Sequence, residues 1–484
     1  MPFEFHAEKL VYGGDALGHH EGRTVLVPRT LPGECLEVEE VRTAKGVVRA
    51  RPLQILAAAP ERVEAPCPHF GRCGGCQYQH FDAERQAVAK REILRETLRR
   101  LGRINWDGEI PVHTGQPWNY RNQAEFKVER RANGGISLGF FESESHRVVD
   151  VDACPILSPR LNALLNALRA PEWSERLARC REIAMLADDR DNEVMLTLRG
   201  TLEQEAKEAL ARDCLAELQG VVSVVIEEQS SRRLHPAAAK GRAANAFGKP
   251  ALVYQVGEFR YQVSPGSFFQ ASRFLLPEFV DAVTREASGS RRTTAQGPHG
   301  QLNPDHSLEG SLALDLFAGV GLLTLPLATG FASVIGVEAG ARAAADLAAN
   351  ARNHGLANVR AVAQTTYDFL RRFAQASPDI AVLDPSRSGV GARTLNLLAA
   401  LRPRRIHCVS CSPPTLARDL ELLLKRGYLL ESVELFDFFP HTYHIEALAR
   451  LTLIMSALNH TPHRISRAAK GIRIPGATAP ENEA

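Results

Sequence analysis

The sequence lacks any run of about 18 apolar residues, so no membrane-spanning helix is expected. Its opening residues, MPFEFHAEKL, lack the basic stretch followed by an apolar stretch that marks a secretory signal, so we expect a cytoplasmic protein. A charge excess is also missing, because 58 Lys and Arg oppose 56 Asp and Glu to give +2. That balance neither requires nor excludes a nucleic-acid partner, since a local basic surface could attract phosphate.

Cysteine is too sparse for a disulfide-stabilised protein, with nine residues in a chain of 484. In a reducing compartment, clustered cysteines are better explained as metal ligands or catalytic groups. The length also exceeds what a single hydrophobic core supports, so roughly two to four domains are expected.

The patterns along the chain predict a multidomain α/β protein. Residues 1–60 alternate β-rich runs with glycine turns, which is typical of a small five-stranded, OB-like barrel that could bind RNA or serve only as a packing module. Residues 61–260 mix strand and helix patterns and are expected to form a central α/β domain. Residues 261–458 alternate short apolar runs with helical segments, which indicates a doubly wound, Rossmann-like domain.

Two segments have the composition of irregular chain. Residues 288–310 are rich in Gly, Ser, Thr, Pro and Asn and predict a flexible linker or insertion. Residues 459–484 hold three prolines and no apolar face, so a disordered tail is expected.

A helix is predicted for DAERQAVAKREILRETLRRLG, residues 82–102, from its helical spacing of apolar residues. The apolar face is expected to hold Val88, Ile93, Leu94, Leu98 and Leu101. The basic residues between them are Lys90, Arg91, Arg95, Arg99 and Arg100. A solvated basic face is the simpler interpretation of this set, and contact with phosphates is the more specific one.

A glycine-rich turn follows the strand pattern at residues 312–316. Gly319 and Gly321 stand between this strand and a helical run, where glycines let the backbone approach a ligand. Glu338 ends the next apolar run, a position from which an acid holds ribose hydroxyls. A dinucleotide and the methyl donor S-adenosyl-L-methionine compete as ligands. The donor is favoured because Thr324 stands where the third glycine of a dinucleotide loop would fall.

Asp384 ends a further apolar run, DIAVLD. Such strand-end carboxylates lie at the sheet edge where doubly wound domains bind ligands. The alternative is that Asp384 only caps a helix or turn.

Four cysteines form a candidate metal site. Cys67, Cys73 and Cys76 follow a C-x5-C-x2-C spacing, and Cys154 is available as a fourth ligand. Such thiolates bind zinc or an iron-sulfur cluster, and the spacing does not separate the two. Either group is expected to be structural, because four cysteine ligands leave no open coordination position.

Cys411 lies in VSCSPPTLARDL, between a predicted strand and a predicted helix. It could be a nucleophile, a metal ligand, a redox partner of Cys408 or a packing residue. Cys408 falls within the strand pattern, so packing is expected for it. A thiol has a pKa of about 8.5, and a helix N-terminus at Pro413 would help to stabilise the thiolate of Cys411.

Together these segments resemble the RNA 5-methyluridine methyltransferase family, whose members methylate carbon 5 of a uridine in ribosomal or transfer RNA. The resemblance covers about residues 1–455. EKLVYGGDALG and VLVPRTLPGE resemble a TRAM domain, an RNA-binding oligonucleotide fold. CPHFGRCGGCQYQH resembles the family's iron-sulfur motif, which implies a [4Fe-4S] cluster on Cys67, Cys73, Cys76 and Cys154. Because this motif is typical of the bacterial ribosomal members, 23S rRNA is favoured over tRNA as substrate. A monomer is also expected.

The resemblance also implies S-adenosyl-L-methionine as methyl donor. VSPGSFFQAS and LDLFAGVGLLTLPLA match the family's donor-binding segments. The implied donor contacts are Gln270, Phe317, Gly319, Gly321, Glu338, Thr365 and Asp384. The chain departs from the family's pattern at Leu322, Thr365 and Ser386.

Two further motifs imply the catalytic pair. VSCSPPTLARDL matches the nucleophile motif through Cys411, and FFPHTYHIEALARL matches the general-base motif through Glu446. A thiolate that adds to carbon 6 of uracil makes carbon 5 nucleophilic, and the base then removes the proton from carbon 5. The uridine is expected to be flipped out of its RNA context. A catalytically silent RNA-binding or assembly protein is the alternative, and the intact catalytic pair argues against it.

Recognition of RNA would fall to the barrel, the basic helix and residues such as Tyr120 and Arg121 in NYRNQAEFKV. The alternatives are core packing for Tyr120 and a surface ion pair for Arg121.

Overall fold

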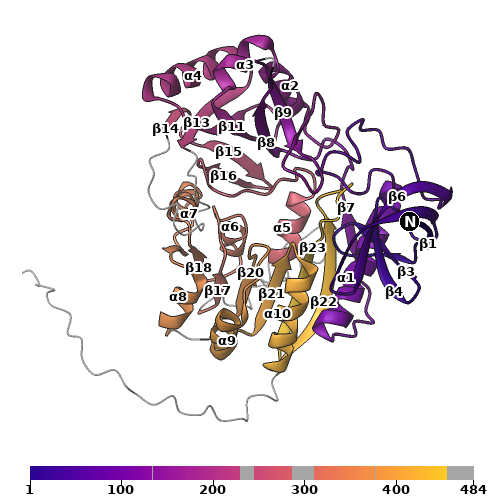
Figure 1. The fold of residues 1–484 in the computed structure, drawn as a ribbon. Coiled ribbons are helices and arrows are strands. Elements are labelled where there is room, and N and C mark those ends of the chain that lie inside the picture. The colour runs from indigo at the N-terminus through magenta and orange to yellow at the C-terminus, as the bar shows by residue number, and fades with distance from the viewer. Residues whose placement is uncertain (133, 229–244, 286–309, 375–376, 455–484) are drawn as a thin grey trace, which may run out of the picture.

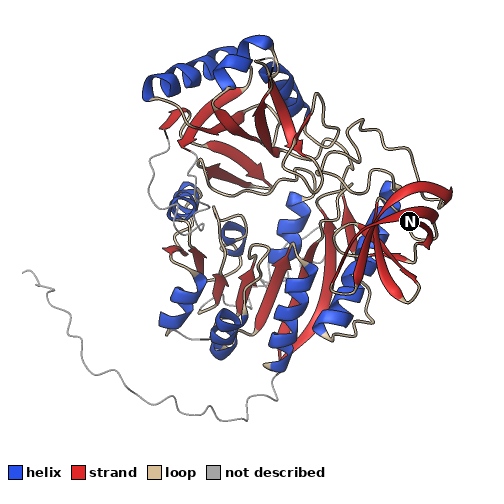
Figure 2. Cartoon of the chain, in the orientation of Figure 1, coloured by secondary structure: helices blue, strands red, loops and turns tan. Residues whose placement is uncertain are grey.

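The structure is a computed structural model, and it describes residues 1–132, 134–228, 245–285, 310–374 and 377–454. The described residues form three large β-sheets and one hairpin, with helices packed on two of the sheets (Figures 1 and 2). The linker predicted at 288–310, apart from Gly310, and the tail predicted at 459–484 lie outside the described residues. Within the described part, no helix is both long and apolar enough to cross a membrane.

The N-terminal sheet has six strands in the order β1-β5-β6-β4-β3-β2. They are β1 (Pro2–His6), β2 (Lys9–Leu10), β3 (Asp15–His20), β4 (Arg23–Pro28), β5 (Cys35–Ala44) and β6 (Val47–Ala57). Phe5, Leu36 and Val38 alternate with outward-facing residues and enter the core. The structure has six strands where the sequence predicted five, because β2 is only two residues long and leaves no periodic signal.

The predicted basic helix is confirmed as α1 (Ala83–Gly102), and Asp82 caps its N-terminus with hydrogen bonds from two backbone N–H groups. Ile93, Leu94 and Leu98 are buried as predicted. The prediction is wrong for Val88 and Leu101, which are exposed.

Lys90 contradicts both interpretations of the basic face, because its side chain is fully buried. Its Nζ donates hydrogen bonds to Asp437 Oδ1 at 2.7 Å and to Phe439 O at 2.9 Å. The partner Asp437 lies 347 residues downstream, so the local pattern of α1 carried no sign of the pair.

The central sheet has seven strands in the order β10-β9-β8-β11-β12-β13-β14. They are β8 (Gln123–Arg130), β9 (Ile136–Phe141), β10 (Val148–Asp150), β11 (Cys180–Ala187), β12 (Val194–Gly200), β13 (Val221–Glu228) and β14 (Asn245–Gly248). Figure 1 shows its helices on the side away from the C-terminal sheet: α2 (Pro159–Leu168), α3 (Pro171–Leu177) and α4 (Gln204–Glu217). The hairpin of β15 (Leu252–Val256) and β16 (Phe259–Val263) follows.

The C-terminal sheet has eight strands in the order β19-β18-β17-β20-β21-β23-β22-β7. They are β17 (Leu312–Asp315), β18 (Ser333–Glu338), β19 (Val359–Ala363), β20 (Ile380–Leu383), β21 (Arg405–Ser410), β22 (Tyr428–Asp437), β23 (Glu446–Leu453) and β7 (Val112–Thr114). The helices of this region are α5 (Leu276–Arg285), α6 (Thr324–Leu327), α7 (Ala341–Asn353), α8 (Thr366–Arg372), α9 (Ala392–Leu401) and α10 (Pro413–Lys425). The predicted doubly wound architecture is confirmed, with β7 added from a segment far upstream.

The order of the parallel strands creates a topological switch point. From β17 the sheet grows through β18 and β19 on one side and through β20 and β21 on the other. Ligands of such sheets bind beyond the carboxyl ends of the strands at this point. The N-terminal sheet and α1 share one hydrophobic core with this domain, and α1 packs on α10. Residues from both ends of the chain therefore meet near the same edge.

Candidate active site

The predicted site residues gather at one edge of the C-terminal sheet. Glu338 ends β18, Asp384 follows β20, and Cys411 follows β21, all of which run parallel. Glu446 begins β23, which runs antiparallel to β21, so it lies at the same edge. Strand direction therefore brings together groups that are far apart in the sequence.

The glycine turn after β17 has the conformation that its residues predict. Gly319 and Gly321 adopt positive φ angles of 53° and 98°, which L side chains rarely adopt. A Cβ atom on Gly321 would also lie 2.5 Å from Cδ1 of Leu347. Glu338 fixes the turn from the next strand, since its Oε2 accepts a hydrogen bond from Gly319 N at 3.0 Å.

Asp315 supports the turn from below, a role that the sequence patterns did not assign. It is buried, and the hydroxyl of Thr324 donates a hydrogen bond to its Oδ2 at 2.6 Å. Burial raises the pKa of the Asp315 carboxyl to about 6. Thr324, which marked only a missing glycine in the sequence, thus anchors the loop to β17.

The remaining predicted donor contacts differ in their surroundings. Gln270 is buried, and Phe317 is half-buried at the start of the glycine turn. Thr365 is exposed at the N-terminus of α8, where its hydroxyl accepts a hydrogen bond from Asp368 N and donates one to Asp368 Oδ2. Its side chain is therefore engaged in capping the helix.

Cys411 lies half-buried between β21 and α10, which begins at Pro413 as predicted. Burial, together with the charges of Glu446 and Asp384, raises the pKa of its thiol to about 11, while the Arg387 guanidinium acts to lower it. These effects outweigh the stabilisation of the thiolate expected from the helix N-terminus. Cys408 is buried within β21, and its predicted packing role is confirmed.

Two carboxyl groups face this thiol. Burial raises the pKa of Asp384 to about 7, and Asp315 adds to the shift. Burial and the nearby charge of Asp384 raise the pKa of Glu446 well above its ordinary value, with Arg387 opposing the shift. Asp384 can therefore take up and release a proton near neutral pH.

Tyr12 and Arg387 complete the surroundings of Cys411, and neither was assigned a role from the sequence. Tyr12 comes from the N-terminal region and donates its hydroxyl to Cys411 O at 3.3 Å, across 399 residues of sequence. Arg387 follows β20, and its Nη2 lies 3.4 Å from His444 Nε2. Only the arginine left a signal, because it follows Asp384 within one motif.

A second site lies between the cysteine-rich segment and the central sheet. Cys67, Cys73, Cys76 and Cys154 line one cavity of about 480 Å³, as predicted from their spacing. Burial raises the pKa of Cys76 to about 12, and the charges of the other three cysteines add to the shift. The four thiols are therefore close enough for their thiolates to repel one another.

The sulfur atoms are nevertheless widely spread. Among the described residues, Glu4, His6 and Cys35 form a group of potential metal ligands whose ligand atoms all lie within 4.8 Å of one another. No three of the four cavity cysteines meet that criterion. A tetrahedral zinc site with Zn–S bonds of about 2.3 Å needs sulfurs about 3.8 Å apart. The sulfurs are therefore farther apart than tetrahedral zinc coordination requires.

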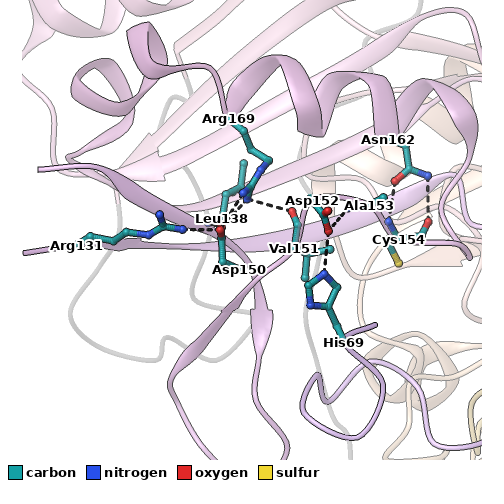
Figure 3. A network of polar contacts seen from close by, with 10 residues as sticks. All are labelled: His69, Arg131, Leu138, Asp150, Val151, Asp152, Ala153, Cys154, Asn162 and Arg169. Atoms are coloured by element: carbon teal, nitrogen blue, oxygen red, sulfur yellow. Dashed lines mark hydrogen bonds and ion pairs between the residues drawn. The ribbon is translucent and has the colours of Figure 1, made fainter. Parts of the chain in front are cut away.

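Cys154 is held by a polar network on the segment after β10 (Figure 3). Asn162 accepts a hydrogen bond from Cys154 N at 2.9 Å and donates one to Cys154 O at 3.0 Å. Asp150 binds the guanidinium of Arg169 with both carboxylate oxygens, and His69 lies 2.9 Å from Asp152 Oδ1. These contacts fix the backbone on both sides of the fourth cysteine.

The two residues predicted as RNA contacts lie in different surroundings. Tyr120 is buried, and its hydroxyl donates to Pro440 O at 3.0 Å, so the core-packing alternative is confirmed. Arg121 lines the four-cysteine cavity and donates from Nε to Gln123 O at 2.8 Å.

Comparison with known proteins identifies a matching family model and related sequences. Residues 305–453 match the family model described as tRNA (Uracil-5-)-methyltransferase. A protein of Alkalilimnicola ehrlichii named 23S rRNA (uracil(1939)-C(5))-methyltransferase RlmD is 33% identical, over 93% of this chain and 96% of that protein. A protein of Aquifex aeolicus named as an uncharacterized RNA methyltransferase is 31% identical, over 93% of this chain and 98% of that protein.

A solved structure has the same overall fold. The Pyrococcus abyssi tRNA (uracil-54, C5)-methyltransferase in complex with S-adenosyl-L-homocysteine aligns with a TM-score of 0.69 and 23% identity. The alignment covers 93% of this chain and 100% of that one, so the likeness extends beyond the C-terminal sheet.

Proposed function

The chain belongs to the RNA uracil-C5 methyltransferase family, and on that premise we propose that it methylates carbon 5 of a uridine in 23S rRNA. It uses S-adenosyl-L-methionine as methyl donor, Cys411 as nucleophile and Glu446 as general base. The observation that carries this proposal is the meeting of Cys411, Glu446 and Asp384 at the edge of the sheet that also holds the glycine turn. The proposed active unit is a monomer.

The reaction needs a thiolate, an electrophilic methyl group and a base. The Cys411 sulfur forms a bond to carbon 6 of uracil, and the electron pair of the 5,6 double bond passes into an enolate. S-adenosyl-L-methionine supplies the electrophilic methyl group on its sulfonium. Glu446 takes the proton from carbon 5 after methylation, and the electrons of that C–H bond restore the double bond as the C6–S bond breaks.

Charged groups of the chain determine the protonation states of Cys411 and Glu446 during these reaction steps. With a pKa of about 11, Cys411 is a thiol at neutral pH, so its proton passes to the nearby Asp384 carboxylate before or during attack. Arg387 is the positive group that favours the thiolate. The raised pKa of Glu446 means that its carboxylate, once ionised, binds a proton strongly, which suits it to accept the proton from carbon 5.

The donor is held at the switch point of the sheet. The positive-φ glycines Gly319 and Gly321 leave backbone free of side chains there, which suits close approach of a ligand. The other donor contacts are Gln270, Phe317, Glu338, Thr365 and Asp384. Because the Thr365 hydroxyl caps α8, its contribution to donor binding is the smallest of this set.

The four-cysteine cavity holds a [4Fe-4S] cluster with a structural role. Four mutually repelling thiolates require a cationic group, and soft sulfur ligands suit iron-sulfur clusters. The wide spread of the sulfurs disfavours zinc. Iron and sulfide analysis of anaerobically purified protein tests this assignment, with about four of each expected per chain. Zinc alone in the sample would refute it.

The N-terminal sheet acts as a TRAM-type RNA-binding barrel, and the three predicted domains at 1–60, 61–260 and 261–458 divide RNA binding, cluster binding and catalysis. The exposed basic residues of α1, such as Arg99 and Arg100, supply attraction to phosphate. A ribosomal substrate places the protein in the cytoplasm.

The function is tested with purified protein, labelled donor and separate 23S rRNA and tRNA substrates. The expected product is 5-methyluridine in 23S rRNA, and the uridine corresponding to the position in the relative's name is the first site to map. Methylation of tRNA alone would favour a tRNA enzyme. Normal RNA binding without methyl transfer to either RNA would favour a catalytically silent RNA-binding protein.

A further inference from the structure

Helix α1 holds the chain segment that leads to the proposed base. Residues 438–445 connect Asp437, the last residue of β22, to Glu446, the first residue of β23. Phe436 and Glu446 are cross-strand partners, so a shift of this connection moves the base directly. We propose that Lys90 and Gln86 of α1 are positioning residues for Glu446, an inference that rests on the proposed function.

Lys90 ties both the start of the connection and its interior to the helix. Its Nζ is fully buried and donates to the Asp437 carboxylate at 2.7 Å and to the Phe439 carbonyl at 2.9 Å. A charged pair in such a buried place persists only with accurate geometry, because each partner has lost its water. The pair therefore fixes the distance between α1 and the end of β22.

Gln86 lies one helical turn before Lys90 and is also buried. Its Oε1 accepts a hydrogen bond from His441 N at 2.7 Å, and its Nε2 donates to His441 Nδ1 at 3.1 Å. One side chain thus binds both the backbone and the ring of His441, which determines the position and the orientation of that residue.

The backbone of His441 shows why such support is needed. His441 has a φ of +64°, a left-handed conformation that is unfavourable for a residue with a side chain. Such a conformation persists where the surroundings over-determine it. The backbone N–H groups of Gln77 and Tyr78 donate to His441 O at 2.9 Å, and Trp118 stacks on its ring at 3.8 Å.

A residue that positions Glu446 affects only the step in which Glu446 removes the proton from carbon 5. A residue that stabilises the whole site affects the earlier steps as well. Thiolate attack and methyl transfer do not require Glu446, whereas release of the product requires it to take the proton from carbon 5. In RNA with 5-fluorouridine, carbon 5 carries fluorine in place of that proton, so the covalent adduct with Cys411 accumulates after methyl transfer. Adduct yield therefore reports the early steps, and turnover on ordinary RNA also reports the step at Glu446.

The first test uses the full chain and the double variant Lys90→Met with Asp437→Asn, which removes both charges so that neither is left buried alone. Turnover on ordinary RNA is expected to fall about 100-fold, as for a misplacement of about 1 Å. Adduct yield with 5-fluorouridine RNA is expected to stay within about twofold of wild type. The control is Lys207→Met, which removes another buried lysine, paired in the central domain with the exposed Glu228, and turnover of this variant is expected to stay unchanged.

Turnover of the double variant within about twofold of wild type would overturn the proposal. A parallel fall of turnover and adduct yield would also overturn it, because it would indicate general damage to the site. If wild type neither methylates nor is trapped, the proposed function fails, and the positioning role fails with it.

The second test compares two changes at Gln86. Gln86→Glu retains an acceptor for His441 N, whereas Gln86→Leu retains none of the hydrogen bonds. Turnover is expected to decrease from wild type to Gln86→Glu to Gln86→Leu, with adduct yield unchanged in all three. Equal turnover in the two variants would contradict the role of the His441 hydrogen bond.

Discussion

The chain places cysteine thiols in two surroundings that raise the pKa for different reasons. In the four-cysteine cavity, burial and neighbouring sulfurs raise the pKa of Cys76 to about 12 and of Cys154 to about 11. At the edge of the C-terminal sheet, burial and two carboxyl groups raise the pKa of Cys411 to about 11. The values are alike, but the neighbours of each thiol differ in kind.

This difference teaches what each site can do. Sulfurs that lie close to other sulfurs repel one another as thiolates, so they become thiolates together only around a cationic group. A thiol beside Asp384, with Arg387 within range, has a proton acceptor and a positive charge that favours the thiolate. The neighbours of a cysteine, more than its pKa, separate a ligand from a nucleophile.

The largest expected effect comes from removing the nucleophile. Cys411→Ser is expected to lower 5-methyluridine formation by about 10⁴-fold or more, because a serine hydroxyl is a far weaker nucleophile. Iron content is expected to stay at the wild-type level, since the four-cysteine cavity is separate. Scintillation counting of labelled RNA and iron analysis measure the two effects. Loss of iron in this variant would show that the two sites are not independent.

Neutralising the proposed base gives the next effect. Glu446→Gln keeps the size of the side chain but cannot accept the proton, so turnover is expected to fall by about 10² to 10⁴-fold. Single-turnover assays with ordinary RNA are expected to show a methylated covalent intermediate that decays slowly. Wild-type turnover in this variant would assign the base elsewhere.

The charge of Arg387 should have a smaller effect that depends on pH. Because Arg387 lowers the pKa of Cys411, its loss raises that pKa and reduces the thiolate fraction at any pH below it. For Arg387→Gln we expect about tenfold slower adduct formation at pH 7 and a profile shifted to higher pH. Arg387→Lys keeps the charge and serves as control. An equal fall at every pH would contradict this account.

The smallest effect is on stability. The pKa of Glu446 is higher in the folded protein than in the unfolded chain, so folding stability is present at acid pH and is lost as pH rises above about 4.3. In Glu446→Gln the side chain does not ionise, so folding stability is not lost at this position as pH rises. The Tm of this variant is expected to exceed that of wild type by about 2 to 4 °C at pH 8 and to match it near pH 4. A Tm difference that does not change with pH would show that the carboxyl is not buried as described.

Sequence patterns predicted the parts of the site that are local. The glycine turn, the strand-end acids and the helix start at Pro413 depend on residues close together in the chain, and the structure has each of them. The family resemblance supplied the roles of Cys411 and Glu446, which periodicity does not indicate.

Contacts between distant segments were beyond sequence reasoning. Lys90 looked like one more basic residue of an amphipathic helix because its partner Asp437 belongs to another element. Tyr12 reaches Cys411 from the N-terminal region, and no local pattern marks it. Strand β7 was missed because three residues are too few for a periodic signal. Each of these features arises from tertiary packing.

The central claim is that Cys411 forms a covalent bond to the target uridine. Trapping with 23S rRNA that contains 5-fluorouridine, followed by proteolysis and mass spectrometry of the nucleotide-linked peptide, tests it most directly. The account predicts one modified peptide, with the methylated fluorouridine attached to Cys411. A nucleotide attached to any other cysteine, or methylation of ordinary RNA without any trapped adduct, would contradict it.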